Sequence, residues 1–286
     1  MHRHAAFDLW LHDDDELALA LGSPLQSRET IHEWPLSCVQ RLRTGAGSRH
    51  IYKVQAPPTV EAEFYARARS PLLVPVRALP AAGTTVALLM EEIDAPRLSD
   101  QAPTQPQAAE IAADLQGRIA GIEGDLPAVA DIGSEEGWRA HIGTALADLR
   151  ACVADGTFRR VDAALADRIA RWCGAPTVLA AVRSPAGHVH ADLKAENVLV
   201  VPGGYRVLDW QRPIRGPVAL DAATLLISLG VDATRHVPVG VVQLHHLLRI
   251  AWFAQAAVRW FPQGRPWFDQ WIAGIAGELE ALDAGS

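Results

Sequence analysis

The chain has 286 residues, 49% of them hydrophobic and 21% charged, a composition typical of a globular protein with enough core for one large domain or two lobes. Its formal net charge of −7 argues against a nucleic-acid-binding protein, which needs a basic face to neutralise phosphates. No run of about 20 apolar residues could cross a membrane, and three scattered cysteines favour a reducing, cytoplasmic setting over a disulfide framework.

The first third of the chain has the pattern of a small β-rich region. Residues 38–43 and 49–54 alternate as strands do, and the residues between them are small enough for a tight turn. A helix is expected from Thr59, whose hydroxyl can cap the segment that follows. Residues 72–76 and 84–90 are further strand candidates. This region is therefore expected to form a sheet with one helix.

Helical periodicity takes over after the proline-containing stretch 96–106. Ser134 is the expected cap of one helix, and Gly174 the expected end of the next. Residues 241–260 are apolar on most sides and predict a buried helix, and Pro266 can open the last one. Apolar residues of this last helix recur at a spacing that favours a core face: Trp267, Trp271, Ile275 and Leu279.

One strand pair interrupts the helices, because two apolar segments flank the turn Pro202-Gly203-Gly204. The whole pattern predicts an α+β, bilobal fold. Residues 1–93 form a small β-rich lobe with one helix, and residues 94–286 form a larger, mainly helical lobe that holds the hairpin.

The hairpin is bordered by the most informative residues of the chain. Asp192 and Asn197 precede its first strand, and Asp209 follows its second. One carboxylate that positions a hydroxyl, together with an amide oxygen and a second carboxylate that hold Mg²⁺, is the equipment of phosphoryl transfer. Each residue alone is also common in turns and caps. The three together, with both strands in place, favour the functional interpretation.

These residues belong to three motifs with a family resemblance. The segment His190-Ala191-Asp192-Leu193-Lys194-Ala195-Glu196-Asn197 resembles the catalytic loop of the aminoglycoside phosphotransferase and choline kinase superfamily, whose fold is similar to that of protein kinases. Leu208-Asp209-Trp210-Gln211 resembles its metal-binding segment, and Gly216-Pro217-Val218-Ala219-Leu220-Asp221 the stretch after it. The close match covers residues 187–226. The usual His-Gly-Asp is His-Ala-Asp here.

The resemblance implies a role for each matching residue of the catalytic loop. Asp192 would orient the acceptor hydroxyl and take its proton, while Asn197 and Asp209 would hold Mg²⁺. Lys194 either contacts the transferred phosphate or is a solvated surface lysine. His190 and Asp221 would brace the loop rather than take part in the chemistry.

The resemblance also implies the ATP contacts of the small lobe. Lys53 stands where these kinases keep a lysine for the α- and β-phosphates, and Glu61 has the family's spacing to Phe64-Tyr65 for its acidic partner. Glu63 would point to another helical face. Ser48, in a turn that is not a proper glycine-rich loop, either donates to the β-phosphate or belongs to a plain hairpin turn.

The strand that ends at Met90 resembles the hinge that receives adenine through backbone groups. Glu91 would supply the carbonyl and Ile93 the N–H; a strand followed by an exposed acidic turn is the alternative. Tryptophans of the last two helices could hold a cationic amine with Asp269 or Glu278 nearby, although their spacing favours a core.

The acceptor is expected to be a small molecule, because only about a dozen residues separate Asp209 from Asp221 and leave no platform for a polypeptide. The sequence thus predicts an ATP- and Mg²⁺-dependent phosphotransferase acting on a small hydroxylated and possibly cationic substrate, with no nucleic-acid or membrane partner. An antibiotic-modifying enzyme is the first candidate. A metabolic kinase for an amino alcohol, sugar or amino acid, a non-catalytic nucleotide-binding protein and a nucleotidyl transferase are the alternatives.

Overall fold

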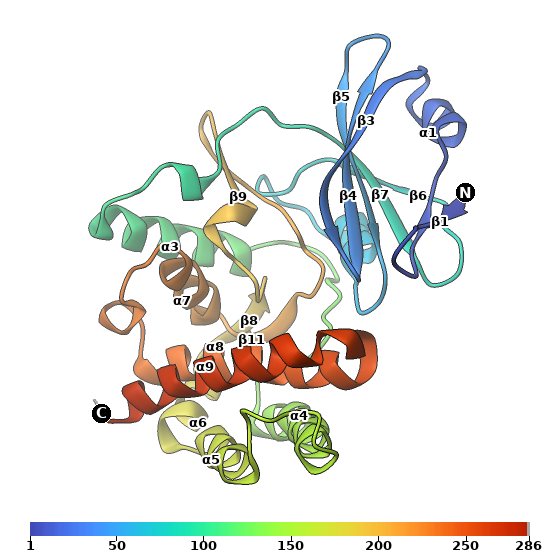
Figure 1. The fold of residues 1–286 in the computed structure, drawn as a ribbon. Helices are drawn as coiled ribbons and strands as arrows, with labels where there is room; N and C mark the ends of the chain where they lie inside the picture. The colour runs from blue at the N-terminus through green and yellow to red at the C-terminus, as the bar shows by residue number, and fades with distance from the viewer. Residues whose placement is uncertain (285–286) are drawn as a thin grey trace. The chain divides into compact units, whose positions relative to one another are not determined.

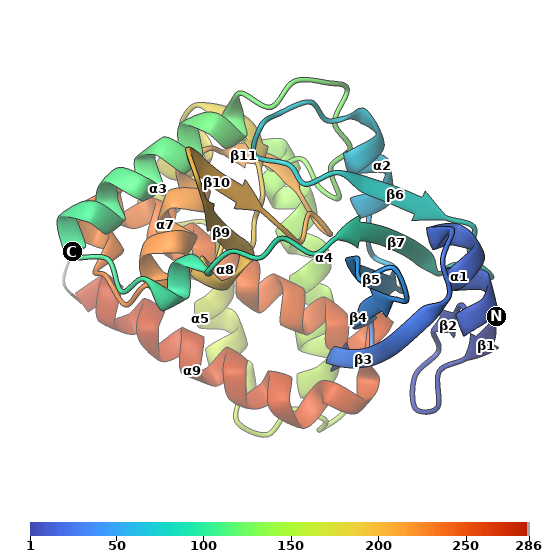
Figure 2. The same cartoon turned by 90° about the horizontal axis from the view of Figure 1, so that it is seen from above.

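The computed structural model describes residues 1–284, which form two compact units (Figures 1 and 2). The first unit contains residues 1–96, 123–126 and 199–211, and the second contains residues 97–122, 127–198 and the chain from Arg212 onwards. The first is rich in strands and the second is mainly helical, so the chain is a mixed α+β protein as the sequence predicted.

A five-stranded antiparallel sheet with the order β3-β4-β5-β7-β6 is the frame of the first unit. Its strands are β3 (Leu25–Trp34), β4 (Ser37–Thr44), β5 (Arg49–Gln55), β6 (Val76–Leu79) and β7 (Val86–Glu91). The central strand β5 places Lys53 opposite Val39 of β4 and Leu88 of β7. Because side chains alternate along a strand, Lys53 and its neighbour Tyr52 lie on opposite faces of the sheet.

The N-terminal segment covers the face that carries Tyr52. It contains β1 (His2–Arg3), β2 (Trp10–Leu11) and α1 (Asp14–Leu21), which precede the sheet in Figure 1. Apolar side chains of this segment and of the sheet form one core cluster: Leu9, Leu11, Leu17, Cys38, Leu42, Tyr52, Val54, Ala87 and Leu89. The segment therefore seals one side of the sheet.

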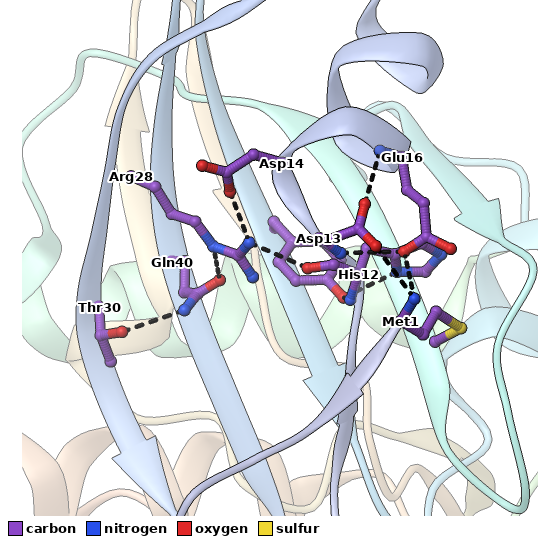
Figure 3. A network of polar contacts seen from close by, with 9 residues as sticks. Met1, His12, Asp13, Asp14, Glu16, Arg28, Thr30 and Gln40 are labelled. Carbon is purple, nitrogen blue, oxygen red and sulfur yellow. Dashed lines mark hydrogen bonds and ion pairs between the residues drawn. The ribbon is translucent and has the colours of Figure 1, made fainter.

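Polar contacts fix this segment in place (Figure 3). Asp13 caps α1 by accepting the N–H of Glu16 at 3.0 Å, and Glu16 accepts the N–H of Asp13 at 2.9 Å, a reciprocal capping box. Arg28 of β3 donates Nη1 to the carbonyl of His12 and to Asp14, both at 2.9 Å. Its Nε donates to Gln40 of β4 at 2.7 Å, so Arg28 ties the segment to two strands.

Helix α2 (Glu61–Arg67) lies against the opposite side of the sheet, beside β7 (Figure 2). The helix begins two residues later than predicted, although Thr59 Oγ1 still accepts the N–H of Glu61 at 3.3 Å. The predicted hairpin of β9 (Val198–Val201) and β10 (Gly204–Val207) is present. The sequence placed it in the helical lobe, whereas residues 199–211 group with the first unit.

The second unit is a helical assembly with one two-stranded ribbon. Its helices are α3 (Gln105–Ala120), α4 (Glu135–Ala154), α5 (Ala163–Cys173), α6 (Pro176–Val182), α7 (Ala219–Ser228), α8 (Val239–Gln255) and α9 (Arg265–Ala284). The ribbon pairs β8 (Ala186–Val189) with β11 (Ile214–Pro217), and short 3-10 turns occur at Leu98–Asp100, Ala195–Asn197, Ala233–Arg235 and Pro262–Gly264. A π-helical turn, Ala256–Trp260, follows α8.

Helix α8 is the centre of this unit because it packs against α4, α6, α7 and α9. Its burial explains why residues 241–260 are apolar on most sides. The predicted cap of α4 is also present, since Ser134 Oγ accepts the N–H of Gly137 at 3.1 Å. No helix within the described chain is both long and apolar enough to span a bilayer.

Two local predictions were wrong. Residues 72–76 form no strand, because Ser70 starts a turn by accepting the N–H groups of Leu72 and Leu73, and β6 begins only at Val76. On α9, Trp267 and Trp271 are 50% and 40% exposed, so they are not core residues. Ile275 and Leu279 are buried as predicted, whereas Phe268 and Ile272 take the buried positions expected for the two tryptophans.

Candidate active site

The first unit brings Lys53 together with two carboxylates from distant parts of the sequence. Lys53 Nζ lies 2.7 Å from Glu61 Oε2 and also donates to Asp209 Oδ1. Lys53 and Glu61 are 6% and 1% exposed. Glu63, in contrast, is exposed and pairs with Arg67 of its own helix at 2.8 Å. Of the two acidic residues, therefore, only Glu61 faces the lysine.

The electrostatics of this cluster keep the lysine charged. Burial alone would lower the pKa of the Lys53 ammonium, but the carboxylates of Glu61 and Asp209 outweigh burial and raise that pKa. Burial also raises the pKa of the Glu61 carboxyl, although the adjacent ammonium of Lys53 opposes the rise. One cation shared by two carboxylates leaves excess negative charge, which favours a further cation at this position.

The backbone after β10 holds Asp209 in an unusual conformation. Asp209 has φ +68°, in the left-handed region that few residues other than glycine, Asn and Asp adopt. Trp210 is fully buried, donates Nε1 to the carbonyl of Val207 at 3.1 Å and stacks on Phe64 of α2 at 4.3 Å between ring centroids. Gln211 donates its side-chain amide to Asp209 Oδ1. The segment is thus fixed against α2.

The second unit organises the loop that carries Asp192. Asp221, in the first turn of α7, accepts the N–H of His190 at 2.8 Å and that of Ala191 at 3.0 Å. Ala191 has φ +68°, which explains why the resembling family places glycine there. Burial raises the pKa of Asp221 to about 6, although His190 and the two N–H groups oppose the rise.

Two side chains close the loop around Asp192. Asn197 donates Nδ2 to the carbonyl of Asp192 at 3.0 Å, so its carbonyl oxygen is the atom left to bind a hard cation. Lys194 Nζ lies 3.1 Å from Asp192 Oδ1, with both side chains partly exposed. Lys194 is therefore both solvated and paired with the proposed catalytic carboxylate.

Backbone geometry at the end of β7 leaves two groups facing away from the sheet. Glu92 donates its N–H to the carbonyl of Arg49 at 3.1 Å. The carbonyl of Glu91 lies opposite the N–H of Glu92 in the same peptide and so points away from β5, and continued extension of the chain would turn the N–H of Ile93 the same way. The neighbouring strand β6 pairs with β7 only as far as Met90. One acceptor and one donor at this spacing match the hydrogen-bonding edge of a purine.

The turn that contains Ser48 is tightly bonded within itself. Ser48 Oγ lies 2.7 Å from Thr44 Oγ1 and 3.0 Å from His50 Nε2. The N–H groups of Gly45 and Gly47 donate to the carbonyls of Pro24 and Thr44. Ser48 must therefore exchange an existing partner before it can contact a phosphate.

Comparison with known proteins shows the family to which the chain belongs. A family model described as the phosphotransferase enzyme family matches residues 51–268. The chain belongs to the phosphotransferase enzyme family. No curated protein matches the sequence significantly.

Solved structures show the fold of this phosphotransferase. A choline/ethanolamine kinase family protein from Mesorhizobium loti is 16% identical, with a TM-score of 0.65 over 94% of this chain and 94% of that one. A thermostable mutant of aminoglycoside phosphotransferase APH(4)-Ia is 16% identical, with a TM-score of 0.61 over 93% and 99%. Spectinomycin phosphotransferase APH(9)-Ia, in complex with ADP and spectinomycin, is 14% identical, with a TM-score of 0.54 over 95% and 99%. The bilobal, protein-kinase-like fold predicted from the sequence is confirmed.

Aromatic residues of the phosphotransferase do not form an open cage for a cation at Trp252. The Arg212 guanidinium carbon lies 3.4 Å from the ring centroid of Trp252, and Trp260 stacks on the same ring at 4.8 Å. A guanidinium this close leaves no room for a second ring on its face, so the two partners cover opposite faces of Trp252. Asp269 is equally engaged, because it accepts the N–H groups of residues 159–161 at 2.9 to 3.1 Å.

Sequence reasoning missed three residues next to the predicted site. Ser228 accepts the N–H of Ala195 at 2.9 Å and so holds the loop between Asp192 and Asn197. Arg212 directly follows the metal-binding segment, and Tyr65 lies one helical turn after Glu61. The i, i+4 spacing of Glu61 and Tyr65 was visible in the sequence, whereas the partners of Ser228 and Arg212 are set by tertiary packing.

Proposed function

We propose that this phosphotransferase transfers the γ-phosphoryl group of ATP, bound with Mg²⁺, to a hydroxyl of a small molecule. Asp192 orients the hydroxyl and Lys53 binds the α- and β-phosphates, with Glu61 orienting the lysine. Asn197 and Asp209 supply oxygen ligands for Mg²⁺. Glu91 and Ile93 bind the adenine through their backbone groups. Ser48 and Lys194 are proposed phosphate contacts, each after exchanging its present partner.

The cluster of buried Lys53 and Glu61 with the partly exposed Asp209 carries this proposal. A buried lysine costs free energy unless carboxylates compensate it, and here they come from positions 8 and 156 residues away in the chain. Such clusters are typical of sites that bind highly charged ligands. A nucleoside triphosphate with its metal brings both charges that this cluster lacks: phosphates for Lys53 and a cation for Asp209.

The donor atoms suit Mg²⁺, which prefers oxygen ligands and few of them from the protein. Asn197 presents its amide oxygen because its nitrogen is bonded to the carbonyl of Asp192. Asp209 presents a carboxylate that the left-handed backbone fixes. When bound, the metal would neutralise charge on the phosphates, and the chain's own groups would orient the reactants.

The proposed step balances with Asp192 as proton acceptor. A bond forms between the acceptor oxygen and the γ-phosphorus, and the bond from that phosphorus to the β,γ-bridging oxygen breaks, which releases ADP. The hydroxyl proton passes to the carboxylate of Asp192. Its exposure of 38% leaves this carboxylate accessible to a substrate.

An aminoglycoside-like, multiply hydroxylated amine is the first candidate acceptor, and a cytoplasmic setting would supply ATP and Mg²⁺. The fold is shared with aminoglycoside phosphotransferases and with a choline/ethanolamine kinase family protein, so a metabolic kinase for an amino alcohol, sugar or amino acid is the second candidate. The covered faces of Trp252 weigh against a quaternary ammonium bound on that ring.

The test is ADP release by purified protein with ATP and Mg²⁺ against a panel of aminoglycosides, amino alcohols, sugars and amino acids. We expect at least one acceptor to stimulate ADP release, and Asp192→Asn to abolish the stimulation while nucleotide binding by calorimetry persists. Asp114→Asn, an exposed carboxylate on α3, is the matched control and should remain active.

The remaining outcomes separate the alternatives. Release of pyrophosphate instead of ADP would identify a nucleotidyl transferase. Binding of ATP without turnover on any acceptor would favour a non-catalytic nucleotide-binding protein. Full activity of Asp192→Asn would remove that residue from the proposed role.

A further inference from the structure

Two tyrosines of the first unit differ in how their hydroxyls are satisfied. Tyr52, on the sheet face covered by the N-terminal segment, accepts the N–H of His12 at 2.9 Å and lies 2.8 Å from His12 Nδ1. Tyr65, on α2, has a hydroxyl that is buried but bonded to no other group in the described chain. The residue as a whole is partly buried, and its hydroxyl is enclosed.

Two further buried side-chain atoms without hydrogen-bond partners belong to Glu61, one helical turn before Tyr65, and to Gln55. Glu61 Oε1 accepts no hydrogen bond within the described residues, whereas Oε2 is bonded to Lys53. Gln55 is fully buried, and its Nε2 is likewise unpaired; it lies near the Glu61 carboxylate without meeting hydrogen-bond geometry. Buried polar groups without partners are rare in native proteins and commonly mark functional positions.

The geometry of α2 makes two of these atoms natural partners. Glu61 and Tyr65 are four residues apart on one helix and therefore share a face. Burial raises the pKa of Tyr65 well above its ordinary value, and the negative charges of Glu61 and Asp209 raise it further. The hydroxyl of Tyr65 is therefore protonated at neutral pH, on the same helical face as Glu61, whose Oε1 lacks a donor.

We infer that Tyr65 is a positioning residue for the nucleotide: its hydroxyl donates to Glu61 Oε1 once Mg²⁺ and the phosphates bind. The inference rests on the proposed function. In the present structure Lys53 is shared by Glu61 and Asp209. With Mg²⁺ held by Asp209 and Asn197 and the phosphates held by Lys53, Glu61 would be the carboxylate that remains to orient the ammonium. Glu61 then holds the lysine alone, and a second bond from Tyr65 fixes its carboxylate.

The test compares Tyr65→Phe with Tyr52→Phe, since each removes one buried hydroxyl and keeps the ring. Tyr65→Phe breaks no hydrogen bond in the free protein, so we expect an unchanged or raised Tm without nucleotide. Its Kd for Mg·ADP and its KM for ATP should rise about tenfold, the effect of one lost bond to a charged group, with kcat little changed. Tyr52→Phe should show the reverse: a lower Tm and an unchanged Kd.

A second variant checks that Tyr65 acts through Glu61. In a Glu61→Ala background, adding Tyr65→Phe should leave the Kd for Mg·ADP unchanged, because the acceptor is already missing. A further tenfold rise in the Kd for Mg·ADP in that background would show that Tyr65 does not act through Glu61.

The failures of the two proposals are distinguishable. If the wild type binds no Mg·ADP and gives no turnover, the proposed function fails. If the wild type binds Mg·ADP and Tyr65→Phe binds it equally well, only the role of Tyr65 fails.

Discussion

Ser228 Oγ accepts the backbone N–H of Ala195 at 2.9 Å from the last turn of α7, while Asp221 in the first turn of the same helix accepts the N–H groups of His190 and Ala191. Helix α7 therefore holds both ends of the loop that contains Asp192. Because a helix is stiff, it fixes the distance between these two anchors.

Replacing Ser228 by alanine should loosen one end of this loop. We expect Ser228→Ala to lower the stability by about 1 kcal/mol, the usual contribution of one hydrogen bond. It should also reduce kcat several-fold at unchanged KM for ATP, measured by ADP release. Ser184→Ala is the matched control, because Ser184 also bonds its hydroxyl to a carbonyl three residues back but contacts no part of the loop. Equal kcat losses in both variants would contradict the anchoring role.

Ala191 offers a test of backbone strain next to Asp192. A non-glycine residue in the left-handed region is strained by about 1 kcal/mol or more, so Ala191→Gly should raise the free energy of unfolding by up to about 1 kcal/mol after the entropic cost of glycine. Ala102 has φ +43° in an exposed loop, and Ala102→Gly is the control for relief of strain elsewhere. Urea denaturation measures both. A destabilised Ala191→Gly variant would show that the methyl group has a packing role.

Lys53 should be essential for the stability of the free protein as well as for activity. Lys53→Met leaves Glu61 buried beside Asp209 without a cation, and breaking a buried pair in this way typically costs about 3–5 kcal/mol. Adding Glu61→Gln removes one of the two carboxylate charges and should restore much of that loss without restoring activity. Chemical denaturation of both variants tests this. Additive losses in the double variant would mean that the cluster is not energetically coupled.

Asp269 should act as a structural anchor and not as a substrate ligand. Asp269→Asn replaces an acceptor oxygen by an N–H facing the backbone N–H groups of Arg159, Arg160 and Val161. We expect a loss of about 2–3 kcal/mol in unfolding free energy, as for hydrogen bonds to a charged group, with KM for the acceptor unchanged. Asp167→Asn removes an exposed pair with Arg150 and should cost almost nothing. An acceptor KM that rises with Asp269→Asn would reverse this assignment.

The free energy of unfolding should decrease as the pH drops below 6.5, the ordinary pKa of histidine. Burial and then Arg249 lower the pKa of His246 from 6.5 to about 4. Glu278 lies 3.2 Å away, but it is half-exposed and forms no hydrogen bond to the ring, so burial dominates. The unfolded chain then binds more protons than the folded protein between pH 6.5 and about 4. The contribution of neutral His246 is complete above pH 6.5 and is lost as the pH falls through this window.

The matching measurement is the unfolding free energy against pH. The difference between 6.5 and about 4 corresponds to roughly 3 kcal/mol. His246→Gln should reduce the slope in this window, and the buried His245, whose pKa is also lowered, should account for part of the slope that remains. Substitution of the exposed His236 serves as control. An identical slope in His246→Gln and the wild type would show that His246 does not carry the effect.

Elements with strong periodicity were predictable from the sequence. Residues 38–43 and 49–54 alternate because they form adjacent central strands, and residues 241–260 are apolar all round because α8 is the centre of its unit. Strand β3 escaped prediction because it is an edge strand with mostly exposed polar residues and no apolar alternation. The start of helix α1 could have been predicted from the sequence, because Asp13 and Glu16 have the spacing of a capping box.

The residues of the candidate site also divide into those that the sequence reveals and those that it does not. Lys53, Glu61, Asp192, Asn197 and Asp209 were selected because their residue types and order carry a recognisable chemistry. Ser228 could not be found, because its loop partner is 33 residues away and a lone serine at a helix end has no distinguishing pattern. The contacts of the Trp252 ring with Arg212 and Trp260 could not be predicted either. The spacing of tryptophans shows on which side of a helix they lie, but not which groups cover each ring.

The stack of Trp210 on Phe64 restricts which inhibitors could work. Val60, immediately before α2, donates its N–H to the carbonyl of Gln211 at 2.9 Å, so the helix is joined to the Asp209 segment by an aromatic contact and by a main-chain bond. Swinging α2 outward would break both contacts and separate Lys53 from Glu61, one of its two carboxylate partners. Ligands shaped for the arrangement in which α2 packs against the Asp209 segment are therefore the better starting point for inhibitors.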